Sequence, residues 1–403
     1  MKIRQRFWLL ILLWALFLLA CEQVSYLILE REDLFDLKLG FLEDQLNLFS
    51  NTGRERLSYN NIFFANGVFY IANGNSQKLI ALSSVGDLLF MLYNPSLNPS
   101  PLLLKLSQTE DMSTLSTRHA VATPFQNLGP FALDHAKNIY IADISNQQSS
   151  NQGLGQPFWI IKQFDRLGNY LGYLGQDGRN GKPFEAYIEN IFFTDNDELV
   201  VICLSNKGRR VFWFNHLFIP LFEIEFDNGL LPPAKEGSAI PSLQAIFPDY
   251  SQRLLYCYIS YYLPIRDPAT RLIHSIIPHS SQIYTFSLES QRYLLGSITV
   301  PADEGLTSDL VFSKDRQTIS LPYNLLGVSA AKGFYLIKRK DQGLYEMLIL
   351  GSNGKPLKRL RISLGDLSLE SCFFNISREG LLYALLVEHD QARVCRWRTD
   401  KIN

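Results

Sequence analysis

The sequence is short of charged residues, and it has no basic stretch beyond its first six positions. Only 19% of the 403 residues are charged, with 38 basic and 39 acidic side chains. The concentrated lysine and arginine of a nucleic-acid-binding protein are therefore missing. Disorder is excluded as well, because hydrophobic residues make up 47% of the chain and aromatic residues 13%. We expect a folded protein with a large core and no nucleic-acid partner.

Motifs for catalysis and cofactor binding are also missing. The sequence has no nucleophile elbow, no phosphate-binding loop and no dinucleotide-binding fingerprint. None of the six histidines occurs at the i, i+4 spacing, with a neighbouring glutamate, that zinc hydrolases show. Helical periodicity is nearly absent after residue 21. These absences predict no catalytic residue, no cofactor and no metal.

The first 21 residues have the pattern of an export signal. Lys2, Arg4 and Arg6 precede an uninterrupted apolar run over 7–19, which is too short to cross a bilayer alone. The run ends in Leu-Leu-Ala-Cys, which resembles the bacterial lipobox, in which the cysteine is acylated and the chain is cut before it. We expect a signal peptide over residues 1–20 and a lipid on Cys21. An ordinary signal peptide that stops beside a cysteine, or an uncut anchor, is the alternative.

A lipid on Cys21 would attach the protein to a bacterial membrane, on the periplasmic side or at the outer cell surface. Removal of residues 1–20 takes away three basic residues and no acidic ones, which leaves 35 basic and 39 acidic residues and a net charge of −4. Attachment should then depend on the acyl chains and not on a basic patch. We expect residues 21–33 to form a tether and residues 34–403 a single domain.

Four further cysteines are spread widely along the chain, at Cys203, Cys257, Cys372 and Cys395. Their spacing is not that of a metal site or of a small disulfide-rich scaffold. Cys372 and Cys395 fall in one repeat unit, so an oxidising compartment would allow a bridge between them. Buried free thiols are the simpler expectation.

Degenerate repeats of short apolar segments follow the export signal. The tetrapeptide Asn-Ile-Phe-Phe occurs at 61–64 and at 190–193, and 372–374 is a third, weaker copy. Each copy is followed by a turn rich in Asn, Asp or Gly and by a second apolar segment, which predicts a β-hairpin. A third strand, a polar turn and a fourth strand come next. The predicted units cover residues 60–93, 130–175, 189–227, 243–300, 327–363 and 371–398.

The last unit contains only three strands. At the other end of the chain, an apolar segment over 34–39 belongs to none of the six units. Four-stranded blades expose apolar faces until neighbours pack on both sides, so a closed ring suits them. We therefore predict an all-β fold, a six-bladed β-propeller of four-stranded antiparallel blades. The N-terminal strand at 34–39 would complete the last blade and close the ring.

Two of the units resemble a known repeat. The sequence Asn-Ile-Tyr-Ile-Ala-Asp at 138–143, with the strand at 160–164 and Gly168, resembles the NHL repeat of six-bladed propellers, and 68–86 is a similar copy. The whole chain looks like the NHL-type propeller lipoproteins of bacteria such as spirochaetes. For Asp143 the resemblance implies a structural role, as an acceptor of hydrogen bonds from backbone amides. The chain departs from that family in long insertions at 94–128, 227–242, 263–281 and 301–326.

These insertions lead to the functional expectation. Loops on one face of an exported propeller commonly form a surface that binds a protein or a small ligand, and prolines in the insertions restrict their freedom. We expect a binding platform in the cell envelope whose partner the sequence does not identify. Two alternatives stay open: a propeller enzyme of the lactonase or lyase type with a metal in the central channel, and an assembly scaffold.

Two polar clusters contain histidines that could be considered as metal ligands. His274 and His279 lie in the proline-rich insertion at 263–281, where they could form a metal site in a loop or be ordinary solvent-exposed side chains. The other polar cluster brings together Arg118-His119 and Asp134-His135. We expect neither pair to be catalytic.

Overall fold

The computed structural model describes residues 27–48, 58–106, 118–145, 158–175, 178–179, 184, 187–235, 237–268, 270–301, 322–365 and 368–401. Within these ranges the chain forms strands, and the helical element is a short 3-10 turn at Thr399–Lys401. None of the described segments forms a helix that is long and apolar enough to span a bilayer. The expected signal peptide at 1–20 and the expected lipid site at Cys21 lie outside these ranges.

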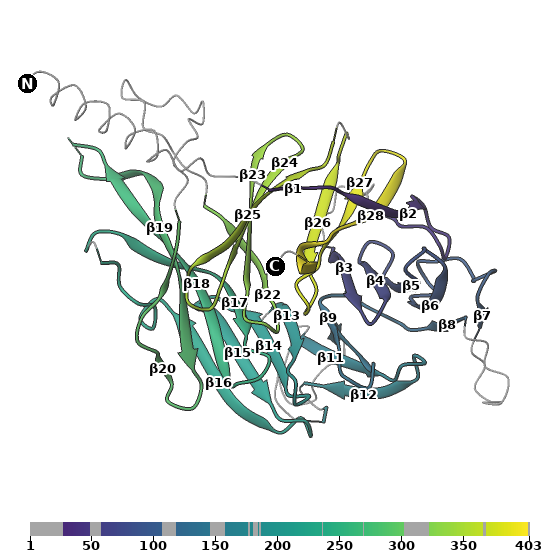
Figure 1. The fold of residues 1–403 in the computed structure, drawn as a ribbon. Helices are drawn as coiled ribbons and strands as arrows, with labels where there is room; N and C mark the ends of the chain where they lie inside the picture. Colours follow the sequence, from purple (N-terminus) through teal and green to yellow (C-terminus); the bar gives the residue numbers. More distant parts are fainter. Residues whose placement is uncertain are drawn as a thin grey trace, which may run out of the picture.

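The strands form six sheets, which we number as blades 1 to 6 in chain order (Figure 1). Blade 1 contains β3 (Asn60–Ala65), β4 (Val68–Asn73), β5 (Lys78–Leu82) and β6 (Leu88–Tyr93), with β8 (His119–Ala122) and β7 (Lys105–Leu106) at its outer edge. Blade 2 contains β9 (Phe131–Leu133), β10 (Ile139–Ser145), β11 (Phe158–Phe164) and β12 (Tyr170–Leu174). Blade 3 contains β13 (Tyr187–Phe193), β14 (Leu199–Leu204), β15 (Gly208–Phe214) and β16 (Pro220–Asp227).

The second half of the ring has the same plan. Blade 4 contains β17 (Ile240–Pro248), β18 (Leu254–Arg266), β19 (Ile273–Ser287), β20 (Arg292–Tyr293) and β21 (Ile298–Val300). Blade 5 contains β22 (Asn324–Val328), β23 (Phe334–Asp341), β24 (Leu344–Leu350) and β25 (Pro356–Ser363), with β1 (Leu27–Leu29) at its outer edge. Blade 6 contains β26 (Ser371–Ile376), β27 (Leu382–Val387), β28 (Gln391–Trp397) and β2 (Glu32–Lys38). All six predicted repeat units are confirmed as blades.

The hydrophobic core shows that the blades form a ring. Buried apolar side chains fall into six clusters, and each cluster is made by two neighbouring blades, including blade 6 with blade 1. The middle strands are covered on both faces by these contacts, which is why β14 and β27 read as continuous apolar segments and not as alternating ones. The protein is a six-bladed β-propeller, as the repeats predicted.

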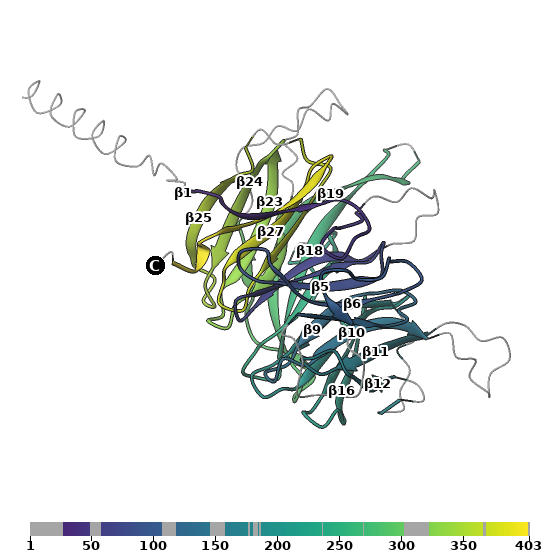
Figure 2. The same ribbon diagram turned by 90° about the vertical axis from the view of Figure 1, so that its right-hand side faces the viewer.

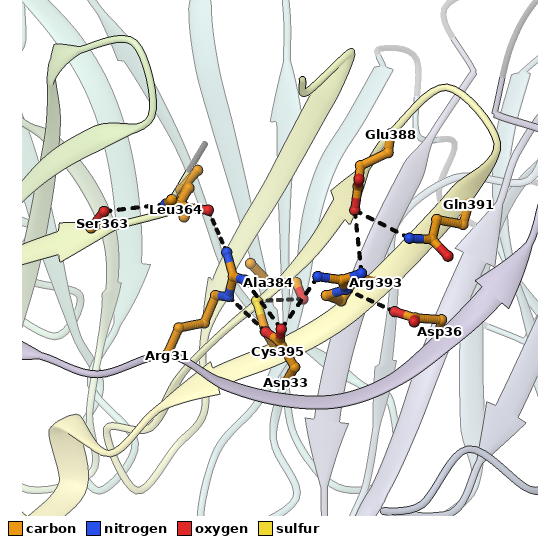
Figure 3. A network of polar contacts seen from close by, with 11 residues as sticks. Arg31, Asp33, Asp36, Ser363, Leu364, Ala384, Glu388, Gln391, Arg393 and Cys395 are labelled. Carbon is orange, nitrogen blue, oxygen red and sulfur yellow. Dashed lines mark hydrogen bonds and ion pairs between the residues drawn. The ribbon is translucent and has the colours of Figure 1, made fainter. Parts of the chain in front are cut away.

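Strand β2 closes the ring at the blade 6 edge. It pairs antiparallel with β28 from Glu32 opposite Arg396 to Lys38 opposite Gln391, and the two strands lie side by side in Figures 1 and 2. A network of ion pairs, shown in Figure 3, supports this pairing: Arg393 lies 2.8 Å from Asp36 and 3.3 Å from Asp33. The closure by the N-terminal strand is confirmed.

The tether predicted at 21–33 is partly wrong. Strand β1 pairs in parallel with β25, from Leu27 opposite Leu360 to Leu29 opposite Ile362, and β2 already begins at Glu32. The Arg31 side chain also donates a hydrogen bond to the Leu364 carbonyl of blade 5. The sequence did not predict β1, because three apolar residues that only cover the edge of another blade leave no periodic pattern.

Antiparallel blades place their connections alternately at two ends. The turns after the first and third strands of every blade lie on one face, which we call the turn face. The turns after the second strand and the links between blades lie on the opposite face, which we call the insertion face. The described ends of all four long insertions lie on the insertion face, as expected.

Candidate functional site

The turn face is built from short polar turns whose first side chain fixes the loop. The side chains of Asp134, Thr194 and Ser329 each accept a hydrogen bond from the backbone amide four residues later, at 2.8–3.1 Å. Asp, Ser and Thr favour such turns because their short side chains can replace a backbone acceptor. These first turns carry the functional groups of the face, since the residues between the fixed ends point away from the sheet.

The first turns of blades 2 to 6 contact one another around the centre of the face. His135 of blade 2 lies 2.7 Å from Asp197 of blade 3, and Lys332 of blade 5 lies 3.1 Å from Asp249 of blade 4. The turns of blades that are not neighbours also meet. Arg378 of blade 6 pairs with Asp195 of blade 3 and lies over the ring of Tyr250 of blade 4, at 4.8 Å.

A pocket of about 350 Å³ opens between blades 3 and 4 on the turn face. Its lining is polar, and it comes from the first turns of both blades and from the third strand or turn of each. The lining residues are Thr194, Asn196, Glu198, Trp213, Tyr250, Ser251, Gln252, Arg253, Leu254, Ser287 and Glu289. We call this the blade 3–4 pocket. Its volume is at the lower end of the range for small-ligand sites.

Glu198 is the buried charge of the blade 3–4 pocket. Its carboxylate accepts a hydrogen bond from Trp213 Nε1 at 2.7 Å and two from the guanidinium of Arg253, at 2.7 and 3.2 Å. Burial alone would raise the pKa of Glu198, but these hydrogen bonds outweigh it and hold the pKa below its ordinary value. The same pairing raises the pKa of Arg253. Both groups are therefore charged at neutral pH.

Tyr250 lines the pocket, and Asp249 precedes it in the first turn of blade 4. Burial would raise the pKa of Asp249, but hydrogen bonds from Tyr256 and Ser251 and the ion pair with Lys332 lower it. Burial raises the pKa of Tyr250 to about 12, so its phenol stays neutral. The pKa values of Glu198 and Asp249 are both lowered, which is the opposite of the shift that a general acid needs at pH 7. The arrangement is suited to hydrogen bonding of a ligand.

Asp143 has the role that the NHL resemblance implied for it. The side chain is completely buried, and it accepts hydrogen bonds from the amides of Gln126 and Asn127 at 3.0 and 2.7 Å. Lys162 lies 2.7 Å from the same carboxylate. Asp143 therefore fixes the chain that leads into blade 2.

The two histidine pairs do not form sites. His119 is buried at the outer edge of blade 1, where its Nε2 lies 2.7 Å from the Leu167 carbonyl, and His135 pairs with Asp197 on the turn face. His274 and His279 are on β19 and not in a loop, which corrects the prediction for 263–281. Across the described ranges no three His, Cys, Asp or Glu side chains are placed to hold a metal ion.

The four cysteines of the propeller are all free thiols. Cys372 is on β26 and Cys395 on β28, and β27 lies between these strands, which explains why they are not bonded. Burial raises the pKa of Cys372 to about 12 and keeps the thiol protonated.

The sequence did not predict the blade 3–4 pocket. Glu198 and Arg253 are 55 residues apart, and each follows an ordinary polar turn. One signal was available: they occupy the same position in consecutive repeats, with opposite charges. Comparison of the turns of neighbouring blades would have found the pair.

No known family model matches this sequence, and no curated protein is significantly similar to it. The chain does resemble solved structures. A protein from Bacteroides fragilis that is assigned as exported is 12% identical, over 92% of this chain and 95% of that one, with a TM-score of 0.40. A gluconolactonase from Xanthomonas campestris is 10% identical over 82% of each chain, with a TM-score of 0.38. Streptogramin B lyase is 9% identical, over 84% of this chain and 93% of that one, with a TM-score of 0.35. Structural similarity at this level of sequence identity gives no information about activity.

Proposed function

We propose that this chain is a membrane-anchored lipoprotein of the bacterial envelope that binds a small polar ligand in the blade 3–4 pocket. The observation that carries the binding function is the pocket itself, a cavity of about 350 Å³ with the buried Glu198 paired to the partly exposed Arg253 at its wall. Because the carboxylate is already neutralised by the guanidinium, the wall is rigid and preformed. A preformed wall lowers the entropy lost when a ligand binds.

The lining defines the class of ligand. Hydroxyl and amide groups of Thr194, Asn196, Ser251, Gln252 and Ser287 can donate and accept hydrogen bonds, whereas exposed apolar surface is scarce. A compound with several hydroxyl groups, such as a monosaccharide or a sugar acid, would satisfy these partners. Platform surfaces on the insertion face, which the sequence suggested, lie on the opposite side of the ring from this pocket.

A thermal-shift and calorimetry screen of sugars and sugar acids tests the binding function. The chain that begins at residue 21 should be stabilised by at least one member of the panel. Asn196→Ala and Gln252→Ala should each weaken binding by roughly three- to tenfold, the effect of about 1 kcal/mol for one hydrogen bond. Ser84→Ala changes an exposed serine on the turn face of blade 1 and serves as the control, with unchanged affinity. An equal loss of affinity in all three variants, or failure of every compound in the panel to bind, would contradict the proposal.

The membrane anchor has its own test. The support for it is the sequence of residues 1–21, with three basic residues, the apolar run at 7–19 and Cys21. In bacterial cells, Cys21→Ser should abolish incorporation of labelled fatty acid and move the protein out of the membrane fraction. Cys203→Ser, which changes a buried thiol of blade 3, should leave labelling intact. Continued labelling of the Cys21 variant would refute the anchor.

A further inference from the structure

The second and third strands of blade 4 extend far beyond the rest of their sheet. Strand β17 pairs with β18 only as far as Tyr262, and β21 pairs with β19 only from Ser281 to Ile283. From Leu263 opposite Ile277 to Arg266 opposite Ile273 the two strands pair only with each other. We call residues 263–277 the arm. At about 3.3 Å per residue its paired part is about 13 Å long. It projects from the insertion face in both ribbon views (Figures 1 and 2).

The tip of the arm is apolar and exposed. Leu272, Ile273 and Ile276 have 70%, 46% and 58% of their surface accessible. Three neighbouring aliphatic side chains on a projecting ribbon are costly in water, and a soluble protein exposes such a group mainly where it meets a partner. The prolines of the arm leave the ribbon edge short of amide donors, so addition of another strand is disfavoured.

The charge of the arm is opposite to that of the whole chain. Its described residues include Arg266 and Arg271 against a single acid, Asp267, whose carboxylate accepts hydrogen bonds from Thr270 at 2.7 and 3.0 Å. The chain from residue 21 onward has a net charge of −4. Because charges are screened within about 8–10 Å at physiological salt, the tip is governed by its own arginines and not by the acidic body. Aliphatic side chains beside arginines match the acyl and phosphate layers of an anionic bilayer.

The length of chain before the propeller brings this surface within reach. Five residues, 22–26, separate Cys21 from β1, so Cys21 lies at most about 20 Å from Leu27. Strand β1 lies on blade 5, next to blade 4, which carries the arm. Because β1 is parallel to β25, the chain from Cys21 enters from the turn-face side, so the lipid and the arm would meet one bilayer along the rim of blades 4 and 5. This step rests on the proposed anchor.

We propose that the arm is a second membrane contact, in which Leu272, Ile273 and Ile276 enter the interface of an anionic bilayer and Arg266 and Arg271 lie among the phosphates. Together with the lipid it fixes the orientation of the propeller. With two points of attachment, the ring cannot turn freely about its tether.

Vesicle binding without the lipid isolates the contribution of the arm. The chain from residue 21 with Cys21→Ser is suitable, because strands from Leu27 onward complete the ring. It should co-sediment with phosphatidylcholine vesicles that contain phosphatidylglycerol. Replacement of Leu272, Ile273 and Ile276 by Ser should reduce this partition by at least roughly tenfold. Arg266→Gln with Arg271→Gln should reduce it by roughly tenfold on these vesicles and leave binding to pure phosphatidylcholine unchanged.

A matched control removes aliphatic surface from the opposite face. Leu217 and Ile219, in the last turn of blade 3, are 62% and 54% exposed, and their replacement by Ser should leave the partition unchanged. Equal partition of the parent and the arm variants, or an equal loss in the control, would overturn the proposal. The result is separate from the anchor: failure of Cys21 to take up lipid in cells would refute the anchor, whereas vesicle binding through the arm would still stand.

Discussion

At the scale of single residues, the pair of Glu198 and Arg253 connects blade 3 to blade 4. The Glu198 carboxylate is buried, so its charge depends on the hydrogen bonds from Arg253 and Trp213. The Arg253 guanidinium is 40% exposed and depends less on Glu198. A buried charge that loses its partners is costly, whereas a neutral amide of the same shape can keep some of the hydrogen bonds.

Glu198→Gln should lower the free energy of unfolding by about 1–2 kcal/mol at pH 7, because the negative charge opposite Arg253 is lost and the amide nitrogen of Gln cannot accept the hydrogen bonds that one carboxylate oxygen accepted. The pKa of Glu198 is lowered in the folded protein, so the stabilisation is complete above the pKa of the unfolded chain, about 4.3, and is lost as the pH falls through the lower folded pKa. Urea unfolding of both proteins between pH 7 and pH 3 measures this. The difference in the free energy of unfolding between the two proteins should narrow below about pH 4. A difference that stays constant with pH would show that the charge of Glu198 does not contribute to stability.

Residue-scale prediction from sequence succeeded where one residue acts within its own repeat. Asp143 accepts hydrogen bonds from amides that are 16 and 17 residues away, at the entry to its own blade, and the resemblance to the NHL repeat implied such a role. Arg378 reaches from blade 6 to Asp195 of blade 3, and no local pattern contains that contact. Groups that meet only because the ring closes could not be found from one sequence.

At the scale of elements, β2 is held by backbone pairing and by the side chains shown in Figure 3. Its Leu37 is buried in the cluster between blades 6 and 1, and Phe35 contacts Phe69 at 5.7 Å. The hydrogen bond that Arg393 donates to Asp36, together with the negative charges of nearby carboxylates, raises the pKa of Arg393. The strand therefore contributes to two interfaces at once, the edge of blade 6 and the joint with blade 1.

Deletion of residues 34–39 should destabilise blade 6 and the whole ring, because β28 loses its partner and Leu37 leaves the core. Arg393→Gln is the milder test: loss of its ion pairs should cost about 1 kcal/mol. Arg398→Gln breaks a local pair with Asp400 at the surface and should cost less than Arg393→Gln. Thermal unfolding followed by circular dichroism measures all three. An unchanged melting curve after the deletion would disprove closure by β2.

Element prediction failed at the arm for a physical reason. Pro264 and Pro268 suggested a loop over 263–281, since proline is rare inside a sheet. Beyond Tyr262 the ribbon has no neighbouring strand that needs amide donors, so prolines are tolerated there.

At the scale of the whole molecule, the sequence predicted the blade number, the strand order and the closing strand. These follow from local patterns that recur six times, and from the physical need of each blade to cover both faces. The pocket could not be predicted in the same way, because it exists only where two blades meet. Its lining combines residues from the first turns of blades 3 and 4 with residues from the third strand or turn of each.

The closing strand also sets the timing of folding. Asp36 and Arg393, which meet at the closure, are 357 residues apart, so the ribosome makes β2 long before its partner. At about 5–20 residues per second this delay is roughly 20–70 s. Throughout that time β2 is an open strand edge that any other nascent chain can pair with. The protein should therefore rely on chaperones that shield its first strand until the last one has been synthesised.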